Sequence, residues 1–135
     1  KKDKADIVAK TDRLEELMQM RGTSLHSARI LVGGVTYKPG VPDLREAPAL
    51  KIMELLEQRG AVVSYHDPLI DHLELAGRVL SSVPINEASL EKTDVVVLVT
   101  PHPGMDYKTL LRAATLILDT SNALEEYSSP NVVPL

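Results

Sequence analysis

The sequence predicts an α/β fold in which a mostly parallel sheet of about five strands carries helices on both faces, after an N-terminal linking helix. Two observations predict it. Short apolar runs that are rich in β-branched residues and do not alternate are typical of strands buried on both faces. These runs alternate along the chain with segments of helical periodicity, and this order implies crossover connections and parallel strand pairing.

The composition is that of one folded domain. The chain has 135 residues, of which 44% are hydrophobic and 25% charged, so a disordered or fibrous protein is excluded. The 15 Lys and Arg residues against 19 Asp and Glu residues give a net charge of −4, which provides no reason to bind nucleic acid or an anionic membrane. No apolar run approaches the roughly 20 residues of a membrane span, and the start has no signal-peptide pattern.

Cysteine is absent, which excludes disulfides, thiolate metal sites and cysteine nucleophiles within this sequence and fits a cytoplasmic protein. Phe and Trp are absent as well, so the aromatic residues are 4 Tyr. The core must therefore consist of aliphatic side chains and Met, and only Tyr or His could stack on a nucleotide base.

A helical apolar pattern opens the chain, and Gly22 is its predicted C-terminal stop. The first residue is Lys1 rather than Met, so we expect either a piece of a longer protein or a trimmed N-terminus. Part of the apolar stripe of helix 5–21 would then be uncovered, and a homodimer through this helix is one candidate assembly. The stripe consists of Ile7, Thr11, Leu14, Leu17 and Met18.

The other elements follow from the same periodicities. Pro48 suits the first position of a helix, where its missing N–H costs nothing, and Gly60 ends that helix. Residues 36–47 are predicted as a loop, residues 69–77 as weakly helical or loop, and the tail from Ser128 as lying loosely on the surface. This order is Rossmann-like. We expect strands at residues 28–35, 61–65, 78–80, 94–99 and 116–119, and helices at residues 48–60, 86–92 and 105–114.

Open parallel sheets bind ligands beyond the carboxyl ends of their strands, so the loops after those ends are candidate sites. The loop at residues 36–47 is the richest. It places Lys38 and Arg45 ahead of a helix N-terminus, where backbone N–H groups and the helix dipole favour anions. Tyr37 could stack on a planar base. The other loops carry His66, Asp67, His102, Ser121 and Asn122.

Two interpretations of this loop stay open. In the first, the cations, the aromatic ring and the helix start together form a nucleotide or phosphate site. In the second, Arg45 pairs with Asp43 or Glu46 on the surface and Lys38 is solvated, because charges on loops are common and their surface pairs contribute little.

Several motifs are absent. Only Gly33-Gly34 follows the first expected strand, so there is no G-x-G-x-x-G, and no phosphate loop of the type G-x-x-x-x-G-K-[ST] occurs. The chain is therefore not expected to hold a dinucleotide in the usual way. The 4 His residues show no i, i+4 spacing, which disfavours a metal site. No serine lies in a G-x-S-x-G elbow, and residues 36–38 lack the acidic residues of a receiver domain.

Residues 34–39, Gly-Val-Thr-Tyr-Lys-Pro, and residues 43–50, Asp-Leu-Arg-Glu-Ala-Pro-Ala-Leu, closely resemble a signature of the UDP-glucose/GDP-mannose dehydrogenase family. The family pattern is roughly G-V-A-Y-K-P-x-x-x-D-x-R-E-S-P-A and belongs to its C-terminal, UDP-binding domain. The resemblance covers residues 25–124 and points to the bacterial UDP-N-acetyl-hexosamine 6-dehydrogenases as the subgroup. Further agreement lies at residues 65–68, 94–97 and 119–123.

The resemblance implies roles for individual residues. Lys38 matches the lysine that contacts the nucleotide sugar, and Tyr37 matches the residue beside the uracil ring. Asp43 and Arg45 belong to the same motif, and they either contact the ligand or brace the loop. Ser121 lies where many members have the arginine of D-T-R-N, which helps to hold the nucleotide, so this cation is missing from the expected substrate-binding set.

Two further residues depart from the family pattern. Ala47 replaces the usual Ser, which removes an N-cap hydroxyl ahead of Pro48 and should cost about 1 kcal/mol of helix stability. Pro101 replaces a frequent Asp before His102. Either the substrate differs from the usual one, or the domain has drifted in function.

Members of the family oxidise a sugar 6-hydroxyl to a carboxylate in two NAD-dependent steps, through a thioester on a Cys. The resemblance implies that residues 1–24 end a helix from a central region and that residues 25–135 form the domain that binds the UDP-sugar. NAD and the catalytic Cys would belong to the missing N-terminal parts, and the remaining domains of the parent enzyme would be partners. The isolated chain would bind no cofactor and be inactive.

Two alternatives are kept. The first is a non-catalytic scaffold or assembly domain that has lost nucleotide binding, as Ser121 and Ala47 suggest. The second is an unrelated flavodoxin-like binding domain, for which the motif match would have to be accidental. A strand followed by G-x-G-x-x-G and a Gly-rich segment with Cys upstream of Lys1 would favour the enzyme.

Overall fold

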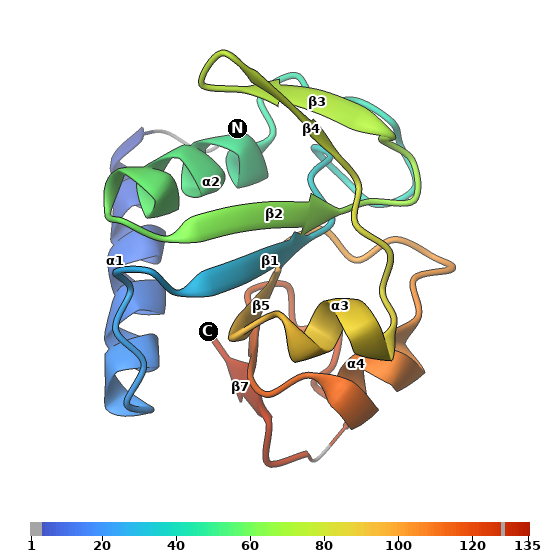
Figure 1. Cartoon of the computed structure of the whole chain (residues 1–135). Coiled ribbons are helices and arrows are strands. Elements are labelled where there is room, and N and C mark those ends of the chain that lie inside the picture. Colours follow the sequence, from blue (N-terminus) through green and yellow to red (C-terminus); the bar gives the residue numbers. More distant parts are fainter. Residues whose placement is uncertain (1–3, 128) are drawn as a thin grey trace.

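The computed structural model of the chain describes residues 4–127 and 129–135 (Figure 1). Within this part, five parallel strands form one sheet in the order β2-β1-β5-β6-β7, and two antiparallel strands form a separate hairpin. The helices are α1 (Lys4–Met20), α2 (Pro48–Gln58), α3 (Glu87–Glu91) and α4 (Tyr107–Ala113). The sheet strands are β1 (Arg29–Gly33), β2 (Val62–His66), β5 (Val95–Leu98), β6 (Ile117–Asp119) and β7 (Val132–Pro134), and the hairpin strands are β3 (His72–Leu75) and β4 (Arg78–Ser81).

The order of the strands reverses at β1. This strand pairs with β2 on one side and with β5 on the other, so that Val32 lies between Tyr65 and Val97. The connections that leave β1 and β5 therefore run in opposite directions across the sheet. Such a switch point, at the carboxyl ends of the strands, is where open parallel sheets bind their ligands.

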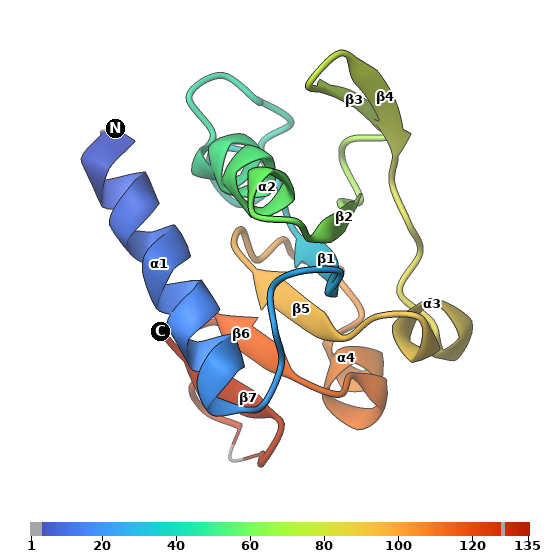
Figure 2. The same ribbon diagram turned by 60° about the vertical axis from the view of Figure 1, so that its left-hand side comes forward.

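Helices cover both faces of the sheet, which confirms the predicted α/β layers (Figure 2). Alternate residues of β1 enter opposite cores: Ile30 and Val32 pack with α1 and α2, whereas Leu31 packs with α3 and α4. All four residues of β5 are buried, as expected for a strand covered on both sides. The two cores are therefore separated by the sheet itself.

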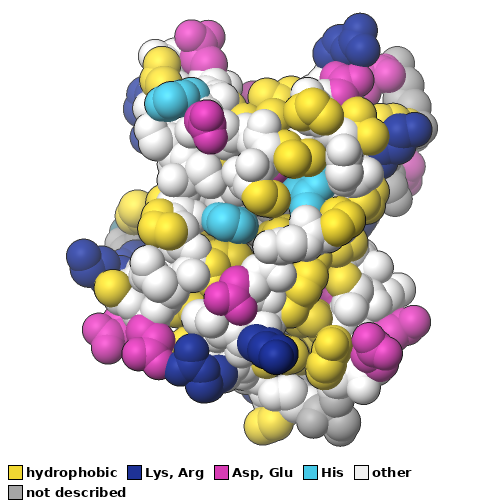
Figure 3. Space-filling view, turned by 90° about the vertical axis from the view of Figure 1, so that its right-hand side faces the viewer, with side chains coloured by type: hydrophobic (Ala, Val, Ile, Leu, Met, Phe, Trp, Pro, Cys, Tyr) yellow, Lys and Arg dark blue, Asp and Glu magenta, His cyan; other side chains and the backbone are white. Residues whose placement is uncertain are grey.

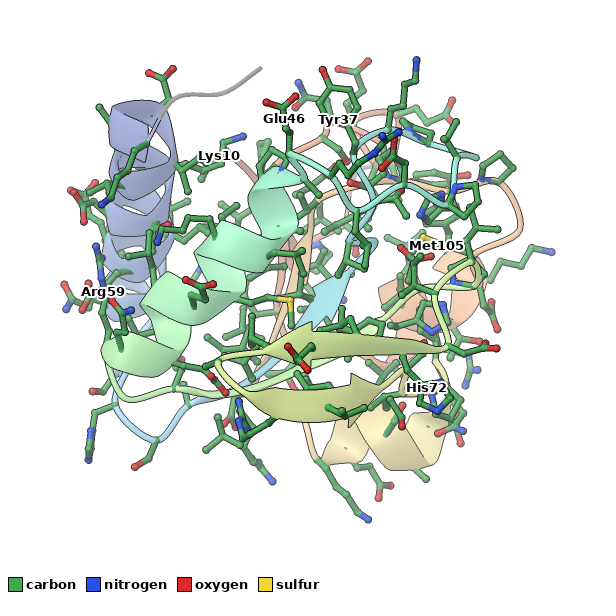
Figure 4. All side chains as sticks on the ribbon, turned by 90° about the horizontal axis from the view of Figure 1, so that it is seen from above. Lys10, Tyr37, Glu46, Arg59, His72 and Met105 are labelled. Carbon is green, nitrogen blue, oxygen red and sulfur yellow. The ribbon has the colours of Figure 1, made fainter. Side chains whose placement is uncertain are left out.

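The apolar stripe of α1 packs against α2, so the expectation that it would be partly uncovered is wrong. Leu14 is 0% exposed, and Ile7, the most exposed residue of the stripe, is only 9% exposed. The guanidinium of Arg59, just after α2, adds ion pairs of 2.8 and 3.0 Å to two carboxylates of α1 (Figure 4). This closed interface removes the apolar surface on which the candidate homodimer was based. Residues 1–3 of the predicted linking helix lie outside the described residues.

The segment predicted as weakly helical or loop contains a strand instead. Burial alternates along β3: Leu73 and Leu75 are buried, whereas His72 and Glu74 are exposed. It pairs antiparallel with β4, the strand expected at residues 78–80. Ala76 and Gly77 both have positive φ, 51° and 80°, which is the conformation that a two-residue hairpin turn requires.

The tail does not lie loosely on the surface: its last residues form β7 and pair in parallel with β6. The side-chain amide of Asn131 donates to the carbonyls of Leu111 and Ala114, at 3.1 and 2.9 Å, which anchors the tail to the end of α4. Pro134 is tolerated because β7 is an edge strand. The fifth strand of the sheet therefore comes from the tail, whereas residues 78–80 belong to the hairpin. Ser128 lies outside the described residues.

Candidate functional site

The carboxyl ends of β1, β2 and β5 converge around Gly34. Its φ is 79°, its N–H donates to the carbonyl of His66 at 2.8 Å, and a Cβ added to it would overlap the carbonyl oxygen of Thr100. A residue with a side chain cannot occupy this position without moving the backbone after β5. The glycine after β1 therefore serves close packing between two strand ends.

The loop at residues 36–47 is held by hydrogen bonds within it, and most of its residues are exposed. The N–H of Tyr37 donates to the carbonyl of Asp43 at 2.8 Å, and this hydrogen bond closes the segment between these two residues. The hydroxyl of Thr36 donates to the carbonyl of Lys38 at 3.0 Å. Tyr37 is 42% exposed (Figure 4). Lys38 is exposed as well, so both side chains project from a fixed backbone.

The pair of Asp43 and Arg45 lies on the surface of this loop. The guanidinium donates through Nε to Oδ1 at 3.1 Å and through Nη2 to Oδ2 at 3.0 Å, while the backbone N–H of Arg45 also reaches Oδ1. These hydrogen bonds lower the pKa of Asp43 and raise the pKa of Arg45. The side chain of Arg45 is nevertheless 89% exposed. The pairing between Arg45 and Asp43 that the second interpretation of the loop describes is therefore present.

A buried network beneath the loop joins two residues that sequence reasoning noted after strands but did not assign to the site. His102, 1% exposed, faces Asp67, 2% exposed, with 2.9 Å between Nε2 and Oδ2. The Nδ1 of His102 accepts the backbone N–H of Gly40 at 3.0 Å. Because Nδ1 is an acceptor here, the ring proton resides on Nε2, where it faces Asp67 and the hydroxyl of Thr36.

The carboxylate of Asp67 links three loops. Its Oδ2 accepts the backbone N–H of Val35 at 2.7 Å in addition to the ring of His102, and its Oδ1 accepts the N–H of Leu69 at 2.8 Å. Val35 follows β1, Asp67 follows β2 and His102 follows β5. In the sequence, each residue lies just beyond a strand end, and Asp67 also lies in the family-like segment at residues 65–68, but neither observation reveals the partners.

Two tyrosine hydroxyls hold the neighbouring segments. Tyr65, at the end of β2, donates to the carbonyl of Ile70 at 2.8 Å, and burial raises its pKa to about 12. Tyr107, half-buried at the start of α4, donates to the carbonyl of His102 at 2.9 Å, and burial raises its pKa as well. Both hydroxyls therefore remain protonated donors at neutral pH.

Ser121 lies in the loop after β6 and is engaged by its own strand end. Its N–H and its hydroxyl both donate to Oδ1 of Asp119, at 3.0 and 2.8 Å, and the N–H of Leu124 donates to Oδ2 at 2.8 Å. Asp119 is 1% exposed, so a buried carboxylate holds the loop after β6 through these hydrogen bonds. Ser121 offers a hydroxyl at this edge, where the family pattern has a cation.

Figure 3 views the carboxyl edge of the sheet. Hydrophobic and histidine side chains gather in the middle of this face, and most charged side chains lie toward its rim. A hollow of about 400 Å³ lies elsewhere, between β2 and α3, and is lined by Ser64, Pro84, Asn86 and Lys92 among others. Its polar side chains Asn86 and Ser89 already cap α3, so we place the candidate site at the loop of residues 36–47 instead.

Among residues 4–127 and 129–135, no helix is both long and apolar enough to cross a membrane. The same residues contain no group of three or more His, Asp or Glu side chains arranged to hold a metal ion.

Comparison with known proteins identifies the family. Residues 31–126 match the UDP-glucose/GDP-mannose dehydrogenase family, UDP binding domain. The chain is 30% identical over 106 residues to the UDP-glucose 6-dehydrogenase TuaD of Bacillus subtilis, covering 77% of this chain and 23% of that protein. It is 27% identical over 119 residues to a UDP-N-acetyl-D-mannosamine dehydrogenase of Methanococcus maripaludis, covering 81% of this chain and 26% of that protein.

Solved structures agree with the fold. A UDP-D-ManNAc dehydrogenase from Pyrococcus horikoshii superposes with a TM-score of 0.70 at 23% identity, over 93% of this chain and 29% of that one. A UDP-glucose dehydrogenase from Pyrobaculum islandicum gives a TM-score of 0.60 at 27% identity, over 81% of this chain and 25% of that one. The chain thus spans about a quarter of the length of such proteins. With its signature loop at the switch point of the sheet and a family match over residues 31–126, the chain belongs to the UDP-glucose/GDP-mannose dehydrogenase family and corresponds to its UDP-binding domain.

Proposed function

We propose that residues 25–135 are the C-terminal nucleotide-sugar-binding domain of an NAD-dependent UDP-sugar 6-dehydrogenase, and that residues 1–24 end the helix that links it to a central region. The observation that carries this proposal is the loop at residues 36–47. Its backbone is fixed by buried contacts while Tyr37 and Lys38 face solvent, which is the arrangement a rigid ligand-binding rim requires.

Each residue of the proposed site has a physical role. The ammonium of Lys38 neutralises phosphate charge, and the ring of Tyr37 packs against the uracil. Asp43 holds Arg45 in place, and the exposed guanidinium edge of Arg45 remains available to an anionic ligand. Ser121 contributes a hydroxyl in place of a cation, so we expect weaker binding of the diphosphate than with an arginine.

The redox chemistry belongs to the rest of the proposed parent enzyme. Oxidation of a 6-hydroxyl to a carboxylate would consume one water and transfer two hydrides, one to each of two NAD⁺ molecules, with release of protons. NAD does not fit the residues of this chain, because the backbone at Gly34 is closed against Thr100 and no G-x-G-x-x-G follows β1. The chain has no Cys for a thioester either. We therefore propose that this chain contributes the substrate side of a cytoplasmic enzyme and is inactive alone.

Calorimetric titration of the full chain with UDP tests the proposal. We expect measurable binding that weakens about tenfold in Lys38→Ala, because the change removes a charge-assisted contact to phosphate. Lys92→Ala is the matched control, since Lys92 is an exposed lysine that precedes β5 at the opposite edge of the sheet. Affinity unchanged in Lys38→Ala would show that Lys38 is misassigned.

A second candidate is a scaffold or assembly domain that has lost nucleotide binding. Ser121 favours this candidate, because its hydroxyl already donates to Asp119 and its side chain provides no positive charge for a phosphate. The same titration separates the two functions. No heat at millimolar UDP, with a chain that circular dichroism shows to be folded, would favour the scaffold.

A further inference from the structure

We propose that His102 is a positioning residue for the nucleotide site: its Nδ1 holds the turn at Gly40 and thereby fixes the backbone from which Lys38 projects. This inference rests on the proposed function, because it assigns a consequence for UDP binding to a residue that does not face the ligand. His102 is 1% exposed, so it can act only through the loop above it.

The turn itself needs an external support. Lys38, Pro39, Gly40 and Val41 form a four-residue turn in which the N–H of Val41 reaches the carbonyl of Lys38 only at 3.4 Å. Pro at the second position and a glycine with φ of 76° at the third are typical of a type II turn. The closing hydrogen bond of the turn is long and therefore weak. The N–H of Gly40 is not used by such a turn and is instead accepted by Nδ1 of His102 at 3.0 Å.

Asp67 determines which ring nitrogen faces the turn. Its Oδ2 lies 2.9 Å from Nε2 of His102 and also accepts the N–H of Val35, while Oδ1 accepts the N–H of Leu69. With both oxygens engaged, the carboxylate cannot rotate, and it keeps the ring proton on Nε2. Nδ1 is then left as the acceptor that Gly40 requires. A buried carboxylate thus orients an imidazole, and the imidazole orients the loop.

The backbone of His102 is also fixed. Its carbonyl accepts the hydroxyl of Tyr107 at 2.9 Å, and its N–H faces the sulfur of Met105 at 3.3 Å. The hydroxyl of Thr36 adds a parallel support, because it donates to the carbonyl of Lys38 and lies 3.1 Å from Nε2 of His102. The residue that carries the proposed phosphate contact is therefore fixed through its own carbonyl and through the turn that follows it.

Two substitutions at one position separate the two bonds of the ring. In His102→Gln the amide nitrogen replaces Nε2 and can still donate to Asp67, but Gly40 loses its acceptor. In His102→Asn the amide oxygen replaces Nδ1 and can still accept from Gly40, but Asp67 loses its donor. His26→Gln is the control, because His26 is an exposed histidine that precedes β1 at the opposite edge of the sheet.

The readouts are the hydrogen-exchange rate of the Gly40 amide by NMR, the affinity for UDP and the thermal midpoint of the full chain. We expect His102→Gln to accelerate exchange at Gly40 and to weaken UDP binding about tenfold, the loss equivalent to one hydrogen bond of the loop. His102→Asn should keep exchange at Gly40 and the affinity for UDP close to the wild-type values, although its thermal midpoint should be lower than that of His102→Gln. His26→Gln should match the wild type.

The outcomes distinguish failure of the inference from failure of the proposed function on which it rests. If both His102 variants lose affinity in step with their thermal midpoints, His102 is merely structural and the inference is wrong. If the wild type gives no heat with UDP, the proposed function fails and the positioning role fails with it. The exchange rate of Gly40 in His102→Gln still reports whether the ring holds the turn. Unchanged exchange there, with UDP binding intact in the wild type, would overturn the inference alone.

Discussion

Two aspartates support the loop at residues 36–47, and their surroundings are opposite. Asp43 binds Arg45 on the surface, where the side chain of Arg45 is 89% exposed. Asp67 binds His102 in the interior, where the two side chains are 0% and 1% exposed. The exposed pair is local, two residues apart in the sequence, whereas the buried pair joins residues 35 apart.

The difference shows which pair holds the loop and which is free to meet a ligand. In water an ion pair gains little, because each ion exchanges solvent for its partner at almost equal free energy. In the interior, water does not readily replace a lost partner, so a buried N–H that donates to Asp67, such as that of Val35, would be left unsatisfied without it. The buried pair therefore sets the position of the loop, and the exposed pair can exchange partners at small cost.

The largest expected effect is that of Asp67→Ala. The change leaves the N–H groups of Val35 and Leu69 without their acceptor and leaves the Nε2–H of His102 with the hydroxyl of Thr36 in place of a carboxylate, so we expect the free energy of unfolding to fall by about 3–5 kcal/mol. Urea denaturation measures it. Asp43→Ala is the matched control and should leave the urea midpoint almost unchanged. Equal shifts in the two variants would contradict the comparison.

An intermediate effect of opposite sign is expected for Ala47→Ser, at the end of the same loop. Ala47 is the N-cap of α2, and it provides no side-chain hydrogen bond to the N–H groups of the first turn. A serine hydroxyl can accept the N–H of Leu50, so we expect a gain of about 1 kcal/mol in the free energy of unfolding. Because neither aspartate pair is touched, UDP affinity should stay constant. A lower urea midpoint would mean that the serine does not fit beside Pro48.

The smallest effect concerns the exposed pair and acid. Arg45 lowers the pKa of Asp43, so this carboxylate adds stability above its unfolded pKa, and the gain is lost as the pH falls through the lower folded value. Arg45→Ala should return the pKa of Asp43 toward its ordinary value, as an NMR titration of the Asp43 carboxyl would show. Asp94, whose pKa is lowered by Arg29, is the internal control and should not move. The backbone N–H of residue 45 remains and still lowers the pKa of Asp43 in part, so only a pKa as low as in the wild type would point to another cause.

The elements that sequence reasoning located correctly have strong local signals. The apolar run of β5 and the stripe of α2 are buried as their periodicities predict. β3 was missed because only Leu73 and Leu75 carry its alternation, between polar residues. β7 was missed because a short segment that contains Pro134 becomes a strand only by pairing with β6.

The candidate site divides in the same way. The exposed position of Tyr37 and the surface pair of Arg45 follow from neighbours in the sequence, and both could be anticipated. The contact between Asp67 and His102 depends on which strand ends meet, and that is fixed by the order of strands in the sheet. Periodicity along one chain carries no information on that order. The buried contact between Asp67 and His102 that supports the loop was therefore missed, whereas the exposed residues of the loop were predicted.

The close approach of Gly34 to Thr100 limits how ligand recognition can diverge in this domain. Backbone meets backbone at that junction, so no substitution there can add a new contact without separating two strands. The positions at the rim, such as Tyr37, Lys38 and Ser121, are free of this restriction because their side chains face solvent or a loop. Specificity can thus evolve, or be engineered, by single exchanges at the rim, while the junction beneath it is held to one residue type by geometry.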